Sequence, residues 1–410
     1  MQSPPVTVEK LAWTDPPLGE IPLPRAPLVM TRSFGSGLTR RASDPPGRIW
    51  AIGDRGPNIK VKDARKLYGA EHLAPLADIS GAKIMPRTDV GPEIAELQVV
   101  EDRVELNRII RLTNPDGSPV SGLPIPGGAH VRSEPVFDMN GKPLAPDPGG
   151  LDTEGIAALP DGGFWVSDEF GPSLVRLDAE GRVLRRLVPQ GFALDAQPVP
   201  EACLPAIAAR RQINRGLEAL AVSNDATSLY LAFQSPLAFP DEEAHEKAAH
   251  VRLWQLDATS GAMQAQYLYP LDAPASFRRD CEAGEFERKD VKISELVCLG
   301  GDALLVLERG SLTTKLYLVE LDGAEPLGPE HLDVETRPTI EELSGAGERL
   351  PALSKQLVFS SDDHPDVGRD LEGVAILSPT VLILVSDNDF GVEGTETGFW
   401  RLRFADPILV

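Results

Sequence analysis

The stretch DTEGIAALPDGGFWVSDEFGP, residues 152–172, decides the fold. Two acids, Asp152 and Glu154, stand before one short apolar run, and two more, Asp168 and Glu169, stand at the end of the next. The pair Asp161-Gly162 separates the runs, and Asp-Gly between two apolar runs is a strong signal of an antiparallel hairpin. The stretch therefore predicts two strands joined by a tight turn, with acids at the open end of both.

The same arrangement recurs along the chain. It appears as SGLTRRASDPPGRIWAIGDRGPN at 36–58, RGLEALAVSNDATSLYLAFQSPLA at 215–238, KISELVCLGGDALLVLERGS at 292–311 and DLEGVAILSPTVLILVSDNDFG at 370–391. Further strands follow most copies, with turn pairs such as Glu180-Gly181 and Asp322-Gly323 between them. Repeated four-stranded units without a helical period between them are typical of propeller blades.

We therefore expect an all-β chain whose residues 1–410 form a single β-propeller domain with long inserted loops. Five four-stranded blades are recognisable, near 36–113, 152–189, 215–272, 292–323 and 370–404. Insertions near 59–94 and 114–150 leave room for a sixth. The N-terminal VTVEKLAWTD is expected to pair with the final strands and close the ring. A solenoid is the competing architecture, but its repeats would be shorter and more uniform.

The acids are explained by hairpin geometry, because the start of the first strand and the end of the second lie on the same rim. In a propeller the first strands line the central channel, so these rims converge on one axis. The predicted metal ligands are Glu154, Glu218, Glu295 and Glu372 at the strand starts, with Asp54 and Asp387 at the strand ends. Any one acid alone could cap a turn, but converged carboxylates repel one another and a cation removes that repulsion. Oxygen ligands without His or Cys favour Ca²⁺, with Mg²⁺ as second choice.

Composition excludes several classes of function. With 62 Asp and Glu against 40 Lys and Arg, the net charge is −22, so we expect neither a nucleic-acid nor a membrane partner. No apolar run reaches the ~20 residues of a membrane span. The three cysteines form no C-x-x-C pair, which argues against zinc and redox motifs and leaves a disulfide open. The chain also lacks a G-x-S-x-G elbow and a P-loop.

Taken together, the hairpins at 152–172, 215–238, 292–311 and 370–391 resemble the phytase-like family, also described as having the esterase-like activity of phytase. SDPPGRIWAIGDRGPN fits the N-terminal end of that family, and the resemblance spans about 36–404. It implies a β-propeller that is usually bacterial and exported, hence periplasmic or secreted, and that hydrolyses phosphate or other esters. The first residues, MQSPPVTVEKLAWTDP, lack the features of a signal peptide, as a mature exported domain would too. Two copies depart from the shared Glu-Gly pair, with Glu218-Ala219 and Glu295-Leu296, and the first copy has no glutamate.

The expected function is metal-dependent hydrolysis of a small-molecule ester, preferably a phosphoester as in phytases, at the top of the central channel. Arg55 and Arg309 could grip phosphate oxygens or form salt bridges to Asp54 and Glu308. Asp168 or Glu169 is the candidate general base. His364, in SSDDHPDVGRDLEG, is a candidate acid or base, or an exposed loop residue.

Two other functions remain open at this stage. One is a calcium-dependent lactonase or aryl-esterase propeller, and the other is a non-catalytic binding module that keeps calcium for stability. The sequence does not indicate an oligomeric state.

Overall fold

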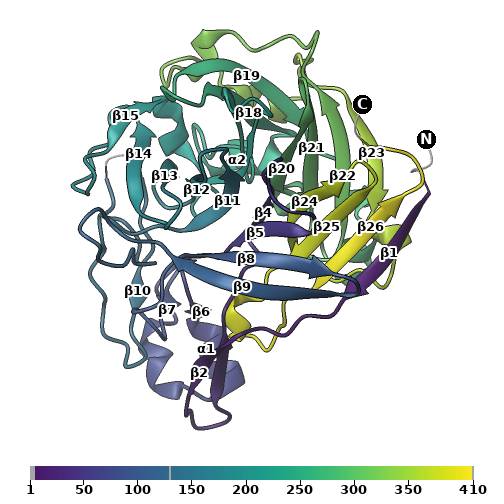
Figure 1. Ribbon diagram of the computed structural model, residues 1–410. Coiled ribbons are helices and arrows are strands. Elements are labelled where there is room, and N and C mark those ends of the chain that lie inside the picture. Colours follow the sequence, from purple (N-terminus) through teal and green to yellow (C-terminus); the bar gives the residue numbers. More distant parts are fainter. Residues whose placement is uncertain (1–4, 129–130, 409–410) are drawn as a thin grey trace.

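The structure, a computed structural model, describes residues 5–128 and 131–408, and five large antiparallel sheets stand around a common axis in it (Figure 1). Sheet 1 contains β4 (Gly37–Thr39), β5 (Arg48–Ile52), β8 (Glu93–Val100) and β9 (Arg103–Arg111). Sheet 2 contains β11 (Thr153–Ala158), β12 (Phe164–Asp168), β13 (Ser173–Leu177), β14 (Val183–Pro189) and a parallel fifth strand, β15 (Glu201–Leu204). Sheet 3 contains β16 (Leu217–Val222), β17 (Ser228–Phe233), β18 (His250–Asp257) and β19 (Met263–Pro270).

Two further sheets complete the ring. Sheet 4 contains β20 (Lys292–Gly300), β21 (Ala303–Arg309), β22 (Thr314–Glu320) and β23 (Lys355–Ser360). Sheet 5 contains β24 (Leu371–Ser378), β25 (Val381–Ser386), β26 (Phe399–Phe404) and β1 (Val6–Leu11). The innermost strands β4, β11, β16, β20 and β24 each lie against the next, and β24 returns to β4. This closed order confirms the predicted β-propeller.

The ring is closed by β1, which pairs antiparallel with β26 from Val6↔Phe404 to Leu11↔Phe399. The last sheet is thus built from both ends of the chain, as Figure 1 shows by the purple strand beside the yellow ones. The expected pairing of VTVEKLAWTD with the final strands is confirmed. The predicted turn pairs are also present, with Gly162, Gly181 and Gly323 at φ of 93°, 82° and 71°.

Apolar side chains pack between neighbouring sheets. Trp50 of sheet 1 meets Phe164 of sheet 2 edge to face, with ring centroids 5.2 Å apart. Cys203, Cys281 and Cys298 are all free thiols. None of the helices in the described residues combines the length and the apolar character that crossing a membrane requires.

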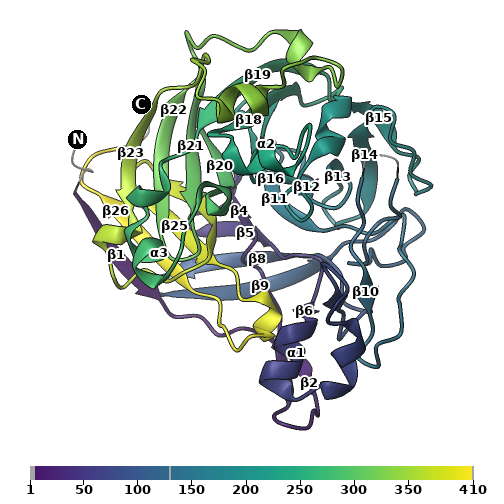
Figure 2. The same ribbon diagram turned by 180° about the vertical axis from the view of Figure 1, so that it is seen from behind.

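The inserted segments and the chain between β1 and β4 form a separate layer beside sheet 1, drawn at the bottom of Figures 1 and 2. It contains β2 (Pro17–Ile21), β3 (Leu28–Thr31), β6 (Ile59–Lys60), α1 (Val61–Tyr68), β7 (Lys83–Ile84) and β10 (Val136–Phe137). Leu28, Ile59, Ile84 and Phe137 share an apolar core of their own there. Within the described residues this layer has two small sheets: β10-β7-β6 comes from the predicted insertions, and β2-β3 comes from the segment between β1 and β4.

The remaining helices are short and lie in connections between strands. They are α2 (Glu242–Lys247), α3 (Arg278–Ala283) and α4 (Ile340–Gly345), with 3₁₀ turns at Glu71–Leu76, Ala206–Arg210, Pro274–Ser276, Arg288–Asp290, Pro329–Leu332, Ser361–Asp363 and Asp389–Gly391.

Candidate functional site

Four of the five innermost strands carry one extra residue at the start, where each pairs with the second strand of its sheet. The pairing skips a position between Leu217 and Ala219 in β16, between Ile293 and Glu295 in β20, and between Leu371 and Gly373 in β24. A similar shift in β11 lies between Thr153 and Ile156. Such bulges re-aim the side chain of the extra residue. The residues at the bulge are Glu154, Glu218, Ser294 and Glu372.

This pairing corrects the repeat alignment at Glu295. Ser294, and not Glu295, occupies the position equivalent to Glu218 and Glu372. Glu295 is fully buried, and its carboxylate accepts hydrogen bonds from the backbone N–H of Leu38 in β4 (2.9 Å) and of Leu296 (3.1 Å). Burial raises the pKa of Glu295 well above its usual range. Glu295 therefore ties β20 to β4 inside the channel, apart from the other predicted ligands.

The room for Glu295 comes from small residues at the equivalent positions of the other strands, Gly155, Ala219 and Gly373. At Gly155 an added Cβ would lie 2.4 Å from the carbonyl oxygen of Glu218 in the next strand. The Glu-Gly pair thus serves two purposes: the acid faces the channel mouth, and the glycine lets neighbouring inner strands approach.

At the ends of the second strands, too, neighbouring positions differ in environment: one residue is buried in the sheet and the next one lines the cavity. Asp168 is fully buried and accepts hydrogen bonds from Ser173 Oγ (2.6 Å) and Arg186 Nη2 (2.8 Å) of its own sheet. Glu308 is equally buried and accepts one from the Tyr269 hydroxyl (2.7 Å). Their oxygens are occupied inside the sheets, so Asp168 is not placed to act as a general base. The residues that follow them, Glu169 and Arg309, line a cavity instead.

This cavity lies at the channel mouth and has a volume of about 490 Å³. Every sheet contributes at least one polar side chain from the start of its first strand or the end of its second. They are Ser36, Asp54, Glu154, Glu169, Glu218, Gln234, Arg309, Glu372 and Asp387. The predicted convergence of polar residues from separate hairpins thus holds for these positions.

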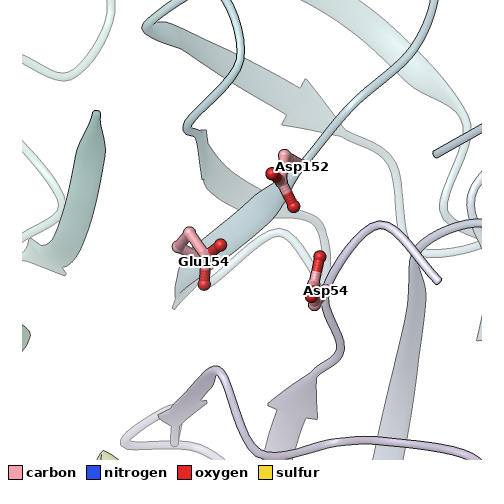
Figure 3. Close-up of side chains that lie close together, drawn as sticks. All are labelled: Asp54, Asp152 and Glu154. Carbon is pink, nitrogen blue, oxygen red and sulfur yellow. The ribbon is translucent and has the colours of Figure 1, made fainter. Parts of the chain in front are cut away.

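Five carboxylates of sheets 1, 2 and 3 form an acidic cluster; Asp54, Glu154, Glu169 and Glu218 line the cavity, and Asp152 is buried beside them. One oxygen each of Asp54, Asp152 and Glu154 lie within 4.8 Å of one another, and so do oxygens of Glu154, Glu169 and Glu218. Figure 3 shows the first trio facing a shared space, with Asp54 in the segment after β5 and Asp152 just before β11. Glu154 belongs to both groups, so it is the centre of the acidic cluster.

Burial without hydrogen-bond donors makes the cluster costly unless a cation compensates it. Oδ1 of Asp152 and Oε2 of Glu218 are buried and accept no hydrogen bond from the described residues, and Oδ2 of Asp152 has the Arg55 guanidinium 3.0 Å away as an ion-pair partner. Burial, and then the charge of neighbouring acids, raises the pKa of Asp54, Glu154 and Glu218 well above the usual range. It raises the pKa of Glu169 to about 7. Oxygen-only donors of this kind suit Ca²⁺ or Mg²⁺, so the residues present fit the expected cation.

Arg55 lies behind the cluster, only 2% exposed, and does not line the cavity. It pairs with Glu134, donates to Asn214 Oδ1 (2.6 Å), and lies 3.0 Å from Asp152 and 3.6 Å from Asp54. The structure therefore gives Arg55 a positioning role, holding Asp54 and Asp152 in place, and leaves it no free path to a substrate.

The other predicted residues are divided between the cavity and its surroundings. Arg309 lines the cavity, where it pairs with Glu372 and donates to Ser294 Oγ (2.8 Å). Asp387 also lines it and accepts a hydrogen bond from Ser33. His364 does not line the cavity; its ring stacks on Phe359 with centroids 5.2 Å apart.

Asp152 and Glu169 are not among the metal ligands predicted from the sequence. The signal was present for Asp152, which stands two positions before Glu154 and so shares its strand face. Lys83, Arg215 and Lys292 also line the cavity, but nothing in their local sequence marks them, because distant insertions and strand starts bring them there.

Comparisons with known proteins identify the family to which the chain belongs. A family model described as phytase-like, "Esterase-like activity of phytase", matches residues 33–390. An uncharacterized secreted protein of Arthroderma benhamiae is 28% identical over an alignment of 260 residues, which covers 55% of this chain and 47% of that protein. The chain thus matches about half the length of this relative.

Solved structures of low sequence identity are similar in outline. The PQQ-bound aldose sugar dehydrogenase of Streptomyces coelicolor is 12% identical, with 98% of this chain and 99% of that one covered and a TM-score of 0.34. The β-propeller domain of Cps50 (Swd1) from Myceliophteria thermophila is 10% identical, with 94% and 99% covered and a TM-score of 0.35. The family model, in contrast, covers most of the chain, from the first repeated hairpin into the last. The chain belongs to the phytase-like family, whose description is esterase-like activity of phytase.

Proposed function

We propose that this chain is a calcium-dependent ester hydrolase that acts preferentially on phosphoesters, with its active site in the cavity at the channel mouth. The observation that carries the proposal is that two trios of carboxylates, Asp54/Asp152/Glu154 and Glu154/Glu169/Glu218, come together from three sheets and share Glu154, and that Asp152 and Glu218 have buried oxygens without a hydrogen bond among the described residues. Family membership supports hydrolysis of an ester, and the donor set supports a hard divalent cation.

Asp54, Asp152 and Glu154 would hold the cation, with Glu218 next to it. When bound, the cation would polarise an ester oxygen and lower the pKa of a coordinated water. Arg55 keeps Asp54 and Asp152 facing each other, which preserves the ligand geometry on which affinity depends.

Glu169 is the candidate general base. Its Oε1 accepts a hydrogen bond from the backbone N–H of Gly216 (3.2 Å), which fixes the carboxylate at the edge of the cluster. From there it can accept a proton from a nucleophilic water as that water attacks the ester. Arg309 lies at the cavity wall, where its guanidinium can stabilise charge on a phosphoryl oxygen.

The test is an ester panel assayed with and without a chelator. We expect p-nitrophenyl phosphate to be hydrolysed in calcium, the activity to disappear in EDTA and to return when calcium is restored. Glu154→Gln should lower kcat/KM by at least ~100-fold, because losing a ligand costs more than losing a residue that only orients one. Glu180→Gln, in an exposed turn, is the matched control.

Other outcomes would point elsewhere. Preferential opening of lactones would favour the lactonase alternative, and calcium-dependent stability without turnover of any ester would favour a binding module. Either result would contradict the proposed phosphoester activity.

A further inference from the structure

A second group of charges lines the same cavity and has the opposite sign. Arg215 immediately precedes β16, Lys292 begins β20 and Arg309 ends β21, so the group belongs to sheets 3 and 4. Lys292 and Arg309 are directly paired across β20 and β21. The acidic cluster, by contrast, comes from sheets 1, 2 and 3. The cavity therefore contains a basic group beside its acidic cluster, with Glu218 and Glu372 close to that basic group.

Lys292 differs from its neighbours because its ammonium group is unpaired. Across residues 5–128 and 131–408, no hydrogen bond or ion pair involves its Nζ atom, although the residue is half-buried. Arg309, in comparison, is bound to Glu372 and Ser294, and Arg215 donates to the carbonyl oxygen of Lys289. A cation that is partly withdrawn from water and has no partner is available to bind an anion.

Burial and the neighbouring cations disfavour the ammonium form of Lys292 in the free protein. The pKa of Lys292 is lowered to about 8, first by burial and then by the charges of Arg309 and Arg215, which Glu372 and Glu218 only partly offset. Like charges held together in a half-buried cavity raise the free energy of the free protein. An anion placed among them would lower it, as a cation would at the acidic cluster.

We infer that Lys292, flanked by Arg215 and Arg309, binds the anionic phosphoryl group of the substrate and so selects phosphate monoesters over neutral esters. The inference rests on the proposed function in that it concerns the same cavity. It adds a specificity-determining residue and a charge class for the substrate. The fully charged monoester benefits most, because it presents two negative charges to this basic group.

The probe is phenylphosphonate, a non-hydrolysable analogue of a phosphate monoester, titrated calorimetrically into the calcium-loaded protein. We expect Lys292→Gln to weaken its binding by ~10-fold or more, the usual scale for a lost hydrogen bond to a charged group. Lys292→Arg keeps the charge and should retain most of the affinity. Lys289→Gln, whose side chain faces Glu287 and Glu246 outside the cavity, is the matched control and should bind as the parent does.

Unchanged phenylphosphonate affinity in a folded Lys292→Gln protein would overturn the inference. If that variant does not fold, lysine acylation of the parent followed by mass spectrometry replaces it. Phenylphosphonate should then protect Lys292 from acylation and leave Lys289 unprotected, and absence of protection at Lys292 would overturn the inference.

Turnover separates this inference from the proposed function. If no ester is hydrolysed but phenylphosphonate binding depends on Lys292, the anion site stands and the hydrolase proposal fails. If esters are hydrolysed and Lys292→Gln lowers kcat/KM equally little for p-nitrophenyl phosphate and p-nitrophenyl acetate, the hydrolase stands and the inference fails.

Discussion

Glu154 and Glu295 are the same amino acid one position apart in the repeat, and their surroundings differ. Glu154 is the bulge residue at the cavity, and no side-chain hydrogen bond or ion pair engages it among the described residues. Glu295 follows the bulge and is bound by backbone donors of Leu38 and Leu296. The motif could be aligned by its letters, but an inserted residue shifts the face of a strand without altering the hydrophobic pattern. The sequence could thus predict that acids converge at the channel mouth, but not that Glu295 lies apart from them.

At the residue scale we predict that Glu295→Gln leaves calcium affinity unchanged, whereas Glu154→Gln lowers it by at least ~10-fold. Glu295→Gln should instead lower the free energy of unfolding by about 1–3 kcal/mol, because one buried backbone N–H loses its acceptor. Calcium titration calorimetry and chemical denaturation measure the two effects separately. Loss of calcium binding in Glu295→Gln with intact stability would instead mean that Glu295 is a calcium ligand, as the repeat alignment predicts.

The inner strand is the element that positions the site, and its small residues matter as much as its acids. The hairpins, the turns with glycine at Gly162 and Gly181, and the pairing of β1 with β26 could all be predicted, because each depends on local patterns or chain order. The bulges could not, since they depend on how neighbouring strands meet at the axis. In the sequence, the only sign of this contact is the glycine of the Glu154-Gly155 pair.

At the element scale we predict that Gly155→Ala destabilises the protein by about 1–3 kcal/mol, the usual cost of overpacking. The added methyl would meet the backbone of β16 at Glu218 and Leu220, so we also expect weaker calcium binding as Glu154 and Glu218 move apart. Gly284→Ala is the matched control, because Gly284 has extended backbone and no atom within 4 Å of an added Cβ. Thermal melting should separate the two variants, and equal melting temperatures would refute close packing at Gly155.

At the scale of the whole molecule, carboxylates gather at the channel mouth, and lysines and arginines reach the same cavity from several parts of the chain. Lys83 reaches the cavity from the insertion between β5 and β8, and Lys292 reaches it from the start of β20. Loop insertions have no repeat to align, so their share of the site could not be predicted from the sequence. The acids were predictable where copies of one hairpin repeat them, as at Glu154, Glu218 and Glu372.

At this scale we predict that the metal-free protein loses stability as pH rises. The pKa of Glu169 is raised from 4.5 to about 7 by burial, and that of Asp54, Glu154 and Glu218 is also raised. The unfolded chain releases these protons near pH 4.5 while the folded chain retains them, so stability is highest below that pH and falls as pH rises through about 7.

Melting temperatures in EDTA should accordingly be higher at pH 5 than at pH 8, and calcium should raise the melting temperature more at pH 8. The Glu154→Gln protein should show a shallower dependence on pH, because one of the crowded carboxylates is gone. A metal-free melting temperature that rises between pH 5 and pH 8 would count against crowded, uncompensated carboxylates.

The central claim is that side chains from separate sheets hold one divalent cation at the channel mouth, and anomalous diffraction tests it most directly. A crystal grown in calcium and measured at a wavelength where calcium scatters anomalously should show a peak among the oxygens of Asp54, Asp152 and Glu154. A well-ordered cavity without that peak, or a peak only at other residues, would contradict it.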